Sequence, residues 1–341
     1  MPSSSEGAGT RRARPGISDN GVSAAGRERV EQIQRARLIA AMVEVSYEHE
    51  LADATVARVV ARAGVSRRTF YELFEDREDC FLAALDEGIA RTSRYVLDSY
   101  DPRAGWVERV RIALSNLLSF LDVERDLAQL LIVASPGAGQ AAFDRRRRVL
   151  AQMIAAIDEG RIQSKGGLQP PPLTAEGIVG GGLSVIHACL VDGKPGRLVE
   201  LANPLMSMIV LPYLGQAAAR KELARRAPRP RARVESENGD PLRELDMRLT
   251  YRTVCVLTSV AANAGGSNRE IGLASGIVDQ GQISKLLRRL ERLGLVQNDG
   301  HAQGKGMPNA WALTAKGVRV ERVMSAEGGR QDVGASARSR R

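Results

Sequence analysis

Residues 55–74, TVARVVARAGVSRRTFYELF, constrain the fold of this chain more than any other stretch. The first valines recur at the spacing of one face of a short helix: Val56, Val59 and Val60. Gly64 then permits the left-handed backbone of a tight turn, and Ser66 can cap the helix that follows. Two short helices joined by a glycine turn predict a helix-turn-helix, whose second helix presents its first turn to base edges in a major groove.

The sequence around this motif resembles the DNA-binding head of the TetR family of bacterial transcriptional regulators. The resemblance extends from about Arg37 to Leu85 and is carried by small, apolar and aromatic residues at matching positions: Thr55-Val56, Ala63-Gly64-Val65-Ser66, Thr69-Phe70-Tyr71, Phe74 and Arg77-Glu78. It implies a three-helix head that binds double-stranded DNA, and an all-α body that binds a small-molecule effector and forms a homodimer. We therefore expect a ligand-responsive regulator, acting as a repressor on a pseudo-palindromic operator.

The resemblance also implies roles for individual residues of the motif. The side chains expected to contact phosphates are Thr55, Tyr71 and Arg77. The side chains expected to face bases are Arg67, Arg68 and Glu72. Two hydroxyl residues at the first turn of the second helix complete the expected interface, namely Ser66 and Thr69. Phosphate contacts would set the affinity, and base contacts would set the choice of sequence.

The composition fits a polyanionic partner. The 341 residues include 49 Lys and Arg against 40 Asp and Glu, which gives a formal net charge of +9. Hydrophobic residues make up 43% of the chain, enough to form sizeable cores, and the length allows two or three domains.

Several classes of chemistry are not expected. Cys80, Cys189 and Cys255 lie far apart without CxxC spacing, which argues against disulfides and zinc sites and for reduced thiols in a cytoplasm. The sequence has no catalytic triad order, P-loop or metal-ligand spacing, so we expect no enzyme activity, cofactor or metal. The N-terminus lacks the apolar segment of a signal peptide. The longest apolar runs, 183–191 and 205–214, are too short to cross a bilayer, so we expect no membrane partner.

Composition and periodicity divide this mainly α chain into six segments. They are a disordered tail (1–26), the helix-turn-helix head (27–75), the all-α body (76–226), a charged linker with prolines (227–241), a second globular unit (242–324) and a disordered basic tail (325–341).

The last two long helices of the body are expected at 174–192 and 197–220. The first contains four glycines, each costing about 1 kcal/mol relative to alanine, so we expect a partner helix to approach it closely. Thr174 is expected to cap it, and Pro204 and Pro212 are expected to bend the second helix. By resemblance, this pair forms the dimer interface.

Candidates for an effector pocket in the body are large side chains on its helices. They are Trp106, Leu117, Phe120, Phe143, Met153 and His187. Each is equally compatible with a place in the core, and a lone histidine such as His187 is more often a core or interface residue than a ligand contact.

The segment 242–324 reads as three helices followed by a two-stranded hairpin and a short helix, which predicts a winged helix. The run 282–296 together with Leu313-Thr314-Ala315-Lys316-Gly317 resembles the MarR-type winged helix. Ser267 with Glu270 forms a capping-box pattern, and Asp279 can cap the third helix.

This second unit carries its own candidate DNA contacts. They are Gln280, Gln282, Ser284, Lys285 and Arg288 on the third helix and Lys305, near His301, on the wing. The alternative is that the winged helix serves protein interaction or dimerisation, because the wing lacks paired arginines at its tip.

Overall fold

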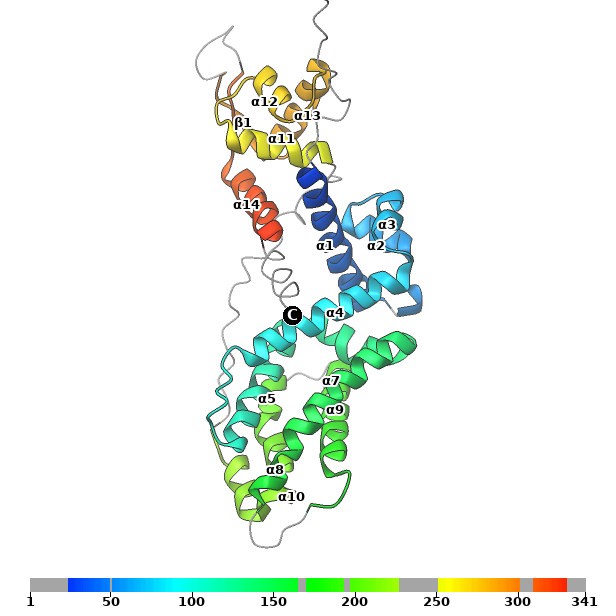
Figure 1. Cartoon of the computed structure of the whole chain (residues 1–341), viewed down its shortest axis with the longest axis vertical. Coiled ribbons are helices and arrows are strands. Elements are labelled where there is room, and N and C mark those ends of the chain that lie inside the picture. The colour runs from blue at the N-terminus through cyan, green and yellow to red at the C-terminus, as the bar shows by residue number, and fades with distance from the viewer. Residues whose placement is uncertain are drawn as a thin grey trace, which may run out of the picture. The chain divides into compact units, whose positions relative to one another are not determined.

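The computed structural model describes residues 24–49, 51–164, 170–192, 197–226, 251–300 and 309–329. The chain divides into two compact units, one built mainly from residues 31–249 and the other mainly from residues 250–321. Both are helical, and the sheet found among the described residues is a two-stranded antiparallel ribbon in the second unit (Figure 1). The expected mainly α architecture, ending in a winged helix, is confirmed.

Some expected segments fall partly or wholly outside the described residues, including the linker at 227–241 and most of the two tails. The first described helix begins at Ala24 and the last ends at Gly329.

The head consists of short helices packed on one long helix. Its elements are α1 (Ala24–Glu48), η1 (Leu51–Asp53), α2 (Val56–Ala63) and α3 (Arg67–Leu73). Phe70 and Phe74 pack with Leu38 and Met42 of α1 and with Val59 of α2 in one buried cluster. Removing these aromatic and aliphatic surfaces from water holds the two short helices, which are too short to be stable alone.

An ion-pair cluster adds a second link between α2 and α1. Arg62 lies 2.9 Å from Glu44 and 2.5 Å from Glu48. The hydrogen bond from Arg62 lowers the pKa of Glu48, so this carboxylate stays ionised and the link persists into mildly acidic solution.

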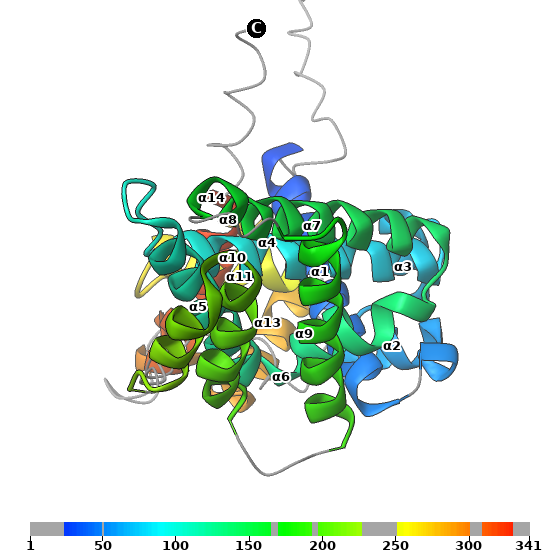
Figure 2. The same ribbon diagram turned by 90° about the horizontal axis from the view of Figure 1, so that it is seen from below.

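The body is a bundle of helices that follows directly from the head. Its elements are α4 (Arg77–Leu97), α5 (Trp106–Val123), α6 (Arg125–Ala128), the π-helix η2 (Gln129–Ala134), η3 (Ser135–Gly137), α7 (Gln140–Asp158), α8 (Gly160–Gln163), α9 (Thr174–Val191), η4 (Leu198–Leu201) and α10 (Ala202–Leu223). Figure 2 shows α9 beside α7 and α10. Asp122, at the end of α5, accepts the amides of Leu198 and Val199 at 2.9 Å and so fixes the start of η4.

Two expectations about the last body helices are wrong. Thr174 does not cap α9, because Leu173 occupies the cap position and the Thr174 hydroxyl donates to the Pro171 carbonyl at 2.7 Å. The segment from 202 to 223 is broken at Gly215 (φ 80°, ψ −179°) rather than merely bent at prolines. A helix cannot continue through that backbone conformation, whereas glycine adopts it freely.

The chain folds back after Gly215, and a buried polar network fixes the returning end. The Asn203 side chain donates to the Arg225 carbonyl at 2.6 Å, which joins the two ends of α10. Arg111 of α5 donates through Nε to Glu222 at 2.8 Å, and both side chains are at most 10% exposed. A buried charge pair of this kind is costly to break, because either charge left alone would be desolvated without a partner.

The second unit has the elements of a winged helix. They are α11 (Tyr251–Ala262), α12 (Asn268–Ala274), α13 (Gln280–Arg292), β1 (Val296–Asn298), β2 (Trp311–Leu313) and α14 (Ala315–Gly329). Residue pairs across the ribbon run from Val296–Leu313 to Asn298–Trp311, and Gly266 bridges to Trp311 on its other side. The capping box of Ser267 and Glu270 forms as expected. Residues 242–250 of the expected first helix and the wing tip at 301–308 lie outside the described residues.

Candidate nucleic-acid interfaces

The turn between α2 and α3 has the geometry that its sequence predicts. Gly64 is left-handed (φ 63°, ψ 32°) and ends α2. Ser66 caps α3, with its Oγ accepting the Thr69 amide at 3.0 Å. Phe70 is fully buried and fixes the opposite face of α3 against the head core. Sequence-local chemistry and core packing therefore orient this helix rigidly.

The face of α3 turned away from the core carries the expected DNA-facing side chains. Arg67, Arg68, Tyr71 and Glu72 are all exposed, Tyr71 by 57%. The Tyr71 ring meets the Phe70 ring edge to face, with centroids 5.4 Å apart. Arg68 donates through Nε to Glu72 at 2.8 Å, yet its side chain remains 89% exposed. The guanidinium group is thus paired on one edge and open on the other.

The remaining expected contacts of the head already take part in bonds within the chain. Thr55 caps α2 and accepts the Arg58 amide at 3.4 Å. The hydroxyls of Ser66 and Thr69 lie 2.8 Å apart and bond to each other. Arg77 donates to the Leu51 carbonyl at 2.5 Å and ties the start of α4 to η1. A phosphate contact from Thr55 or Arg77 would use donors that these bonds leave free.

Helix α13 forms a second cationic face. Asp279 caps it, with Oδ1 accepting the amides of Gly281 at 2.7 Å and Gln282 at 3.0 Å. One side is buried, through Ile283, Leu287 and Leu290. The exposed side chains include Gln280, Gln282, Lys285, Arg288, Arg289 and Arg292, and Ser284 is half-buried. Five of the six expected contacts of this unit therefore share one helix, and Lys305 lies outside the described residues, as does His301.

One residue of this surface could not be found from the sequence. Arg252 of α11 donates to Oε1 of Gln282 at 3.0 Å, across 30 positions of the chain. It thereby fixes the orientation of an amide that can hydrogen-bond an adenine. Two apolar side chains that precede this helix in the sequence are exposed, Leu273 of α12 by 67% and Val278 by 83%.

The expected effector-pocket residues belong to two packing clusters or lie exposed on the body. Trp106 and Phe120 are buried in two different clusters, and Trp106 donates to the Ala156 carbonyl at 2.9 Å. Leu117 packs on the cluster of Phe120, and Met153 on that of Trp106. Phe143 is 50% exposed, and His187 lies exposed on α9. Periodicity marks apolar faces but not which cluster each face enters.

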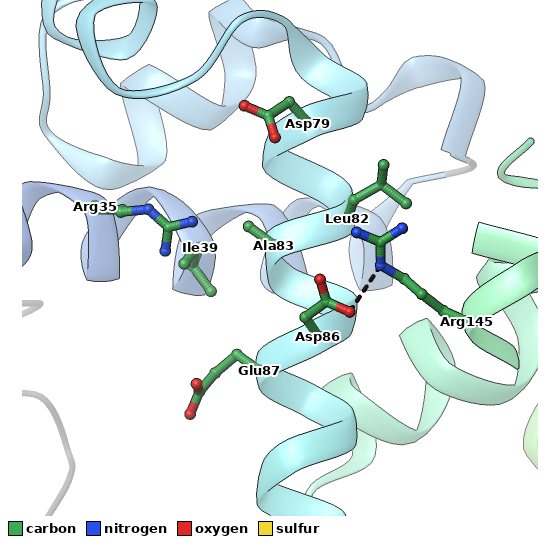
Figure 3. Close-up of a pocket in the computed structure, with 8 residues that line it drawn as sticks. All are labelled: Arg35, Ile39, Asp79, Leu82, Ala83, Asp86, Glu87 and Arg145. Carbon is green, nitrogen blue, oxygen red and sulfur yellow. Dashed lines mark hydrogen bonds and ion pairs between the residues drawn. The ribbon is translucent and has the colours of Figure 1, made fainter. Parts of the chain in front are cut away.

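The structure instead shows a hollow of about 300 Å³ where the head meets the body (Figure 3). Its lining residues are Arg35 and Ile39 of α1, Asp79, Leu82, Ala83, Asp86 and Glu87 of α4, and Arg145 of α7. An ion pair crosses it, with Arg145 Nε 2.7 Å from Asp86. Arg35 also lies over the ring of Phe74, 5.0 Å from its centroid. The hollow therefore contacts the same aromatic core that supports α3.

These features define the class of protein: a regulator-type fold with a helix-turn-helix head on a helical body and a winged helix at its C-terminal end. Residues 38–84 match the family model described as "Bacterial regulatory proteins, tetR family". Residues 249–317 match the model described as "Winged helix DNA-binding domain". The chain thus contains a TetR-type head at residues 38–84 and a winged-helix DNA-binding domain at residues 249–317.

Solved structures with a similar fold cover about half of this chain. They include the fatty acid degradation regulator FadR from Bacillus halodurans (19% identity, TM-score 0.47, covering 52% of this chain and 94% of that one). FadR from Bacillus subtilis in complex with stearoyl-CoA has 20% identity and a TM-score of 0.45, with 51% and 97% covered. A TetR-like regulator from Rhodococcus sp. RHA1 has 18% identity and a TM-score of 0.44, with 52% and 94% covered. Comparison with curated protein sequences gave no match.

Within the ranges that the structure describes, His, Cys, Asp and Glu form no group of three or more able to hold a metal ion. Two helical stretches, Thr174–Val191 and Leu198–Leu223, have the length and apolar composition of a membrane span. Half of the second stretch is buried in the body, and a core helix of a soluble protein has the same length and composition.

Proposed function

We propose that this protein is a ligand-responsive transcriptional regulator whose α3 helix reads an operator. The observation that carries the proposal is the placement of Arg67, Arg68 and Tyr71 on the exposed face of a helix whose other face is anchored by the fully buried Phe70. Such a helix can enter a major groove as a rigid unit, with guanidinium groups at the base edges. Because the chromosome is the target, we place the protein in the bacterial cytoplasm and expect it to repress transcription.

The proposed dimer uses the apolar surface of α9 and α10, over residues 174–192 and 197–220. Only 22% of the residues of α9 are buried within the chain. A Cβ atom added to Gly177, Gly180 or Gly181 would meet nothing within 4 Å. No contact inside the protomer therefore requires these glycines, which fits a second copy whose helix approaches them closely. A two-fold dimer would bind a pseudo-palindromic site with half-sites about one helical turn, or a multiple of it, apart.

We place the effector's action at the junction of head and body. The pair formed by Asp86 of α4 and Arg145 of α7 lies in the hollow that also contacts α1. A small molecule that binds the two arrangements of α4 and α7 with different affinity would shift the spacing of the two heads.

The winged helix is proposed as a second DNA-binding unit, because α13 exposes Lys285, Arg288, Arg289 and Arg292 beside a capped first turn. A second candidate function is a docking module for another protein. It is favoured by Leu273 and Val278, whose exposed apolar surface beside α13 is unusual for a phosphate-binding face.

The main test is selection of preferred sites from random DNA with the purified full-length protein, followed by affinity measurement at one salt concentration. We expect Arg68→Ala to weaken binding and to relax the preference at one position of each half-site, by about 1–3 kcal/mol. Tyr71→Phe should weaken binding to all sequences alike, because a phosphate contact carries no sequence information.

Arg147→Ala is the matched control, since it removes one exposed arginine from α7 in the body. Equal loss on selected and random DNA for Arg68→Ala would refute its role in base reading. A changed site preference for Tyr71→Phe would refute the phosphate contact. Failure of the unaltered protein to select any site would refute the proposed function itself.

A further inference from the structure

We infer that Glu72 positions Arg68 for reading guanine and does not itself read a base; this inference rests on the proposed function of α3. The two side chains are four residues apart on the exposed face of the helix. Arg68 Nε donates to Glu72 Oε1 at 2.8 Å, which occupies one edge of the guanidinium group.

The stability of α3 does not account for this pair. Arg68 lies in the first turn of the helix, where the backbone dipole is positive, and Glu72 lies near its other end, where the dipole is negative. Both charges are therefore at the unfavourable ends. The order is also the weaker one, because an acidic residue four positions before a basic one stabilises a helix better than the reverse.

The geometry of the Arg68–Glu72 pair is suited to holding Arg68 in position for contact with a base. With Nε bonded to Glu72, the two terminal nitrogens of Arg68 remain available, and the side chain is 89% exposed. Those nitrogens can donate together to O6 and N7 of one guanine, the commonest specific contact of arginine. Holding a long side chain in one orientation lowers the conformational entropy lost on binding. Neighbouring Arg67 has no such hydrogen bond or ion pair among the described residues and is left to contact DNA without this restraint.

The pairing also changes the expected role of Glu72. A free glutamate in a major groove can accept from the amino group of cytosine. Here one carboxylate oxygen of Glu72 already accepts a hydrogen bond from Arg68. Without that partner, the negative carboxylate would be repelled by the negative phosphates of the DNA. The sequence expectation that Glu72 faces a base is therefore replaced by a positioning role.

The test compares Glu72→Ala, Arg68→Ala and the double variant of the full chain by site selection and by affinity for single-base variants of the selected site. We expect Arg68→Ala to reduce one guanine preference by about 5- to 150-fold. Glu72→Ala should reduce the same preference at the same position by at least about threefold, but by less than Arg68→Ala does. The double variant should lose no more than Arg68→Ala alone, because the two residues act as one unit. Replacing that guanine by 7-deazaguanine, which lacks N7, should weaken the unaltered protein and not Arg68→Ala.

Glu75→Gln is the control, because Glu75 is an exposed acid just beyond α3 and its replacement changes the net charge equally. Thermal unfolding confirms that each variant is folded. A changed preference at a different position for Glu72→Ala would mean that Glu72 reads a base itself. Unchanged preferences would mean that the pair is only a surface ion pair. Either result overturns the inference while leaving the proposed function intact, which fails only if the unaltered protein selects no site.

Discussion

At the scale of single residues, Gly317 allows α14 to pack against the rest of the winged helix. A Cβ atom built on Gly317 would lie 1.9 Å from the carbonyl oxygen of Leu295. The start of α14 therefore sits directly on the backbone that leads into β1. The Thr314 hydroxyl reinforces this contact by donating to the Gly294 carbonyl at 2.5 Å. The last residue of the Leu-Thr-x-Lys-Gly pattern is therefore a glycine because the backbone contact with Leu295 leaves no room for a Cβ atom.

We expect Gly317→Ala to destabilise the winged-helix unit by about 1–3 kcal/mol, because the backbone must move to accommodate the methyl group. Unfolding of this unit can be followed by the fluorescence of Trp311 in a Trp106→Phe background, since the chain has two tryptophans. Val318→Ala, at the exposed neighbouring position, should have little effect. Equal stability of Gly317→Ala and the parent would show that α14 is not packed against Leu295 in this way.

A second prediction at this scale concerns the pH dependence of the capping box. The hydrogen bond from the Ser267 backbone, followed by that from its hydroxyl, lowers the pKa of Glu270 below its usual 4.5. A carboxyl group whose pKa is lower in the folded state than in the unfolded state stabilises the folded state at pH values above its unfolded pKa. That stabilisation is lost as the pH falls through the folded value. We expect Glu270→Gln to lower the Tm of the unit at pH 7 and the difference from the parent to vanish well below pH 4.5.

Glu291→Gln provides the comparison, because Glu291 is exposed on α13 and its side chain makes no ion pair or hydrogen bond within the described part of the chain. A difference between Glu270→Gln and the parent that stayed constant from pH 7 to pH 3 would contradict an ionised cap.

At the scale of elements, α9 is the helix whose sequence is least explained by its own protomer. Its inner face is buried through Val179, Leu183 and Ile186, as in any amphipathic helix. Its outer face carries Gly177, Gly180 and Gly181 with open space around them, although glycine disfavours a helix. Such a face is unfavourable for an isolated chain and suits close contact with another helix.

We expect replacement of these three glycines by alanine to stabilise the protomer, by up to about 1 kcal/mol at each position, and at the same time to weaken the dimer. Sedimentation velocity over a range of concentrations measures the association, and thermal unfolding measures the protomer. Gly137→Ala, at an equally open position outside α9 and α10, should leave association unchanged. An unaltered dimer in the triple variant would exclude a close approach at these glycines.

At the scale of the whole molecule, two exposed recognition helices in one chain predict two kinds of contact with DNA. Footprinting of the full-length protein on a selected operator should show two protected regions, one of which disappears when residues 242–341 are removed. The region that remains should be the one weakened by Arg68→Ala. If the shortened protein gives the same footprint as the full chain, the winged helix is a docking module, and the exposed Leu273 and Val278 become its candidate contact surface.

Local rules made the elements of both DNA-binding units predictable. Ser66, Asp279 and the pair of Ser267 and Glu270 cap helices in the structure as their sequence positions indicate, because capping involves residues within one turn. The same rules failed at Thr174, where the Leu173 backbone and the Pro171 carbonyl changed the local partners. In the body, local rules could not indicate that Trp106 and Phe120 enter different packing clusters, because that depends on how the helices pack.

The sequence by itself determined the two recognition helices and the charges on their exposed faces, since periodicity, glycine turns and caps are all short-range properties. Only the tertiary structure decided which long-range partners hold those charges and where the body is hollow. Arg252 meets Gln282, Arg145 meets Asp86 and Arg111 meets Glu222 across tens of residues. Such pairings depend on how helices pack in space, and helix packing depends on the shapes of whole faces, which no local spacing specifies.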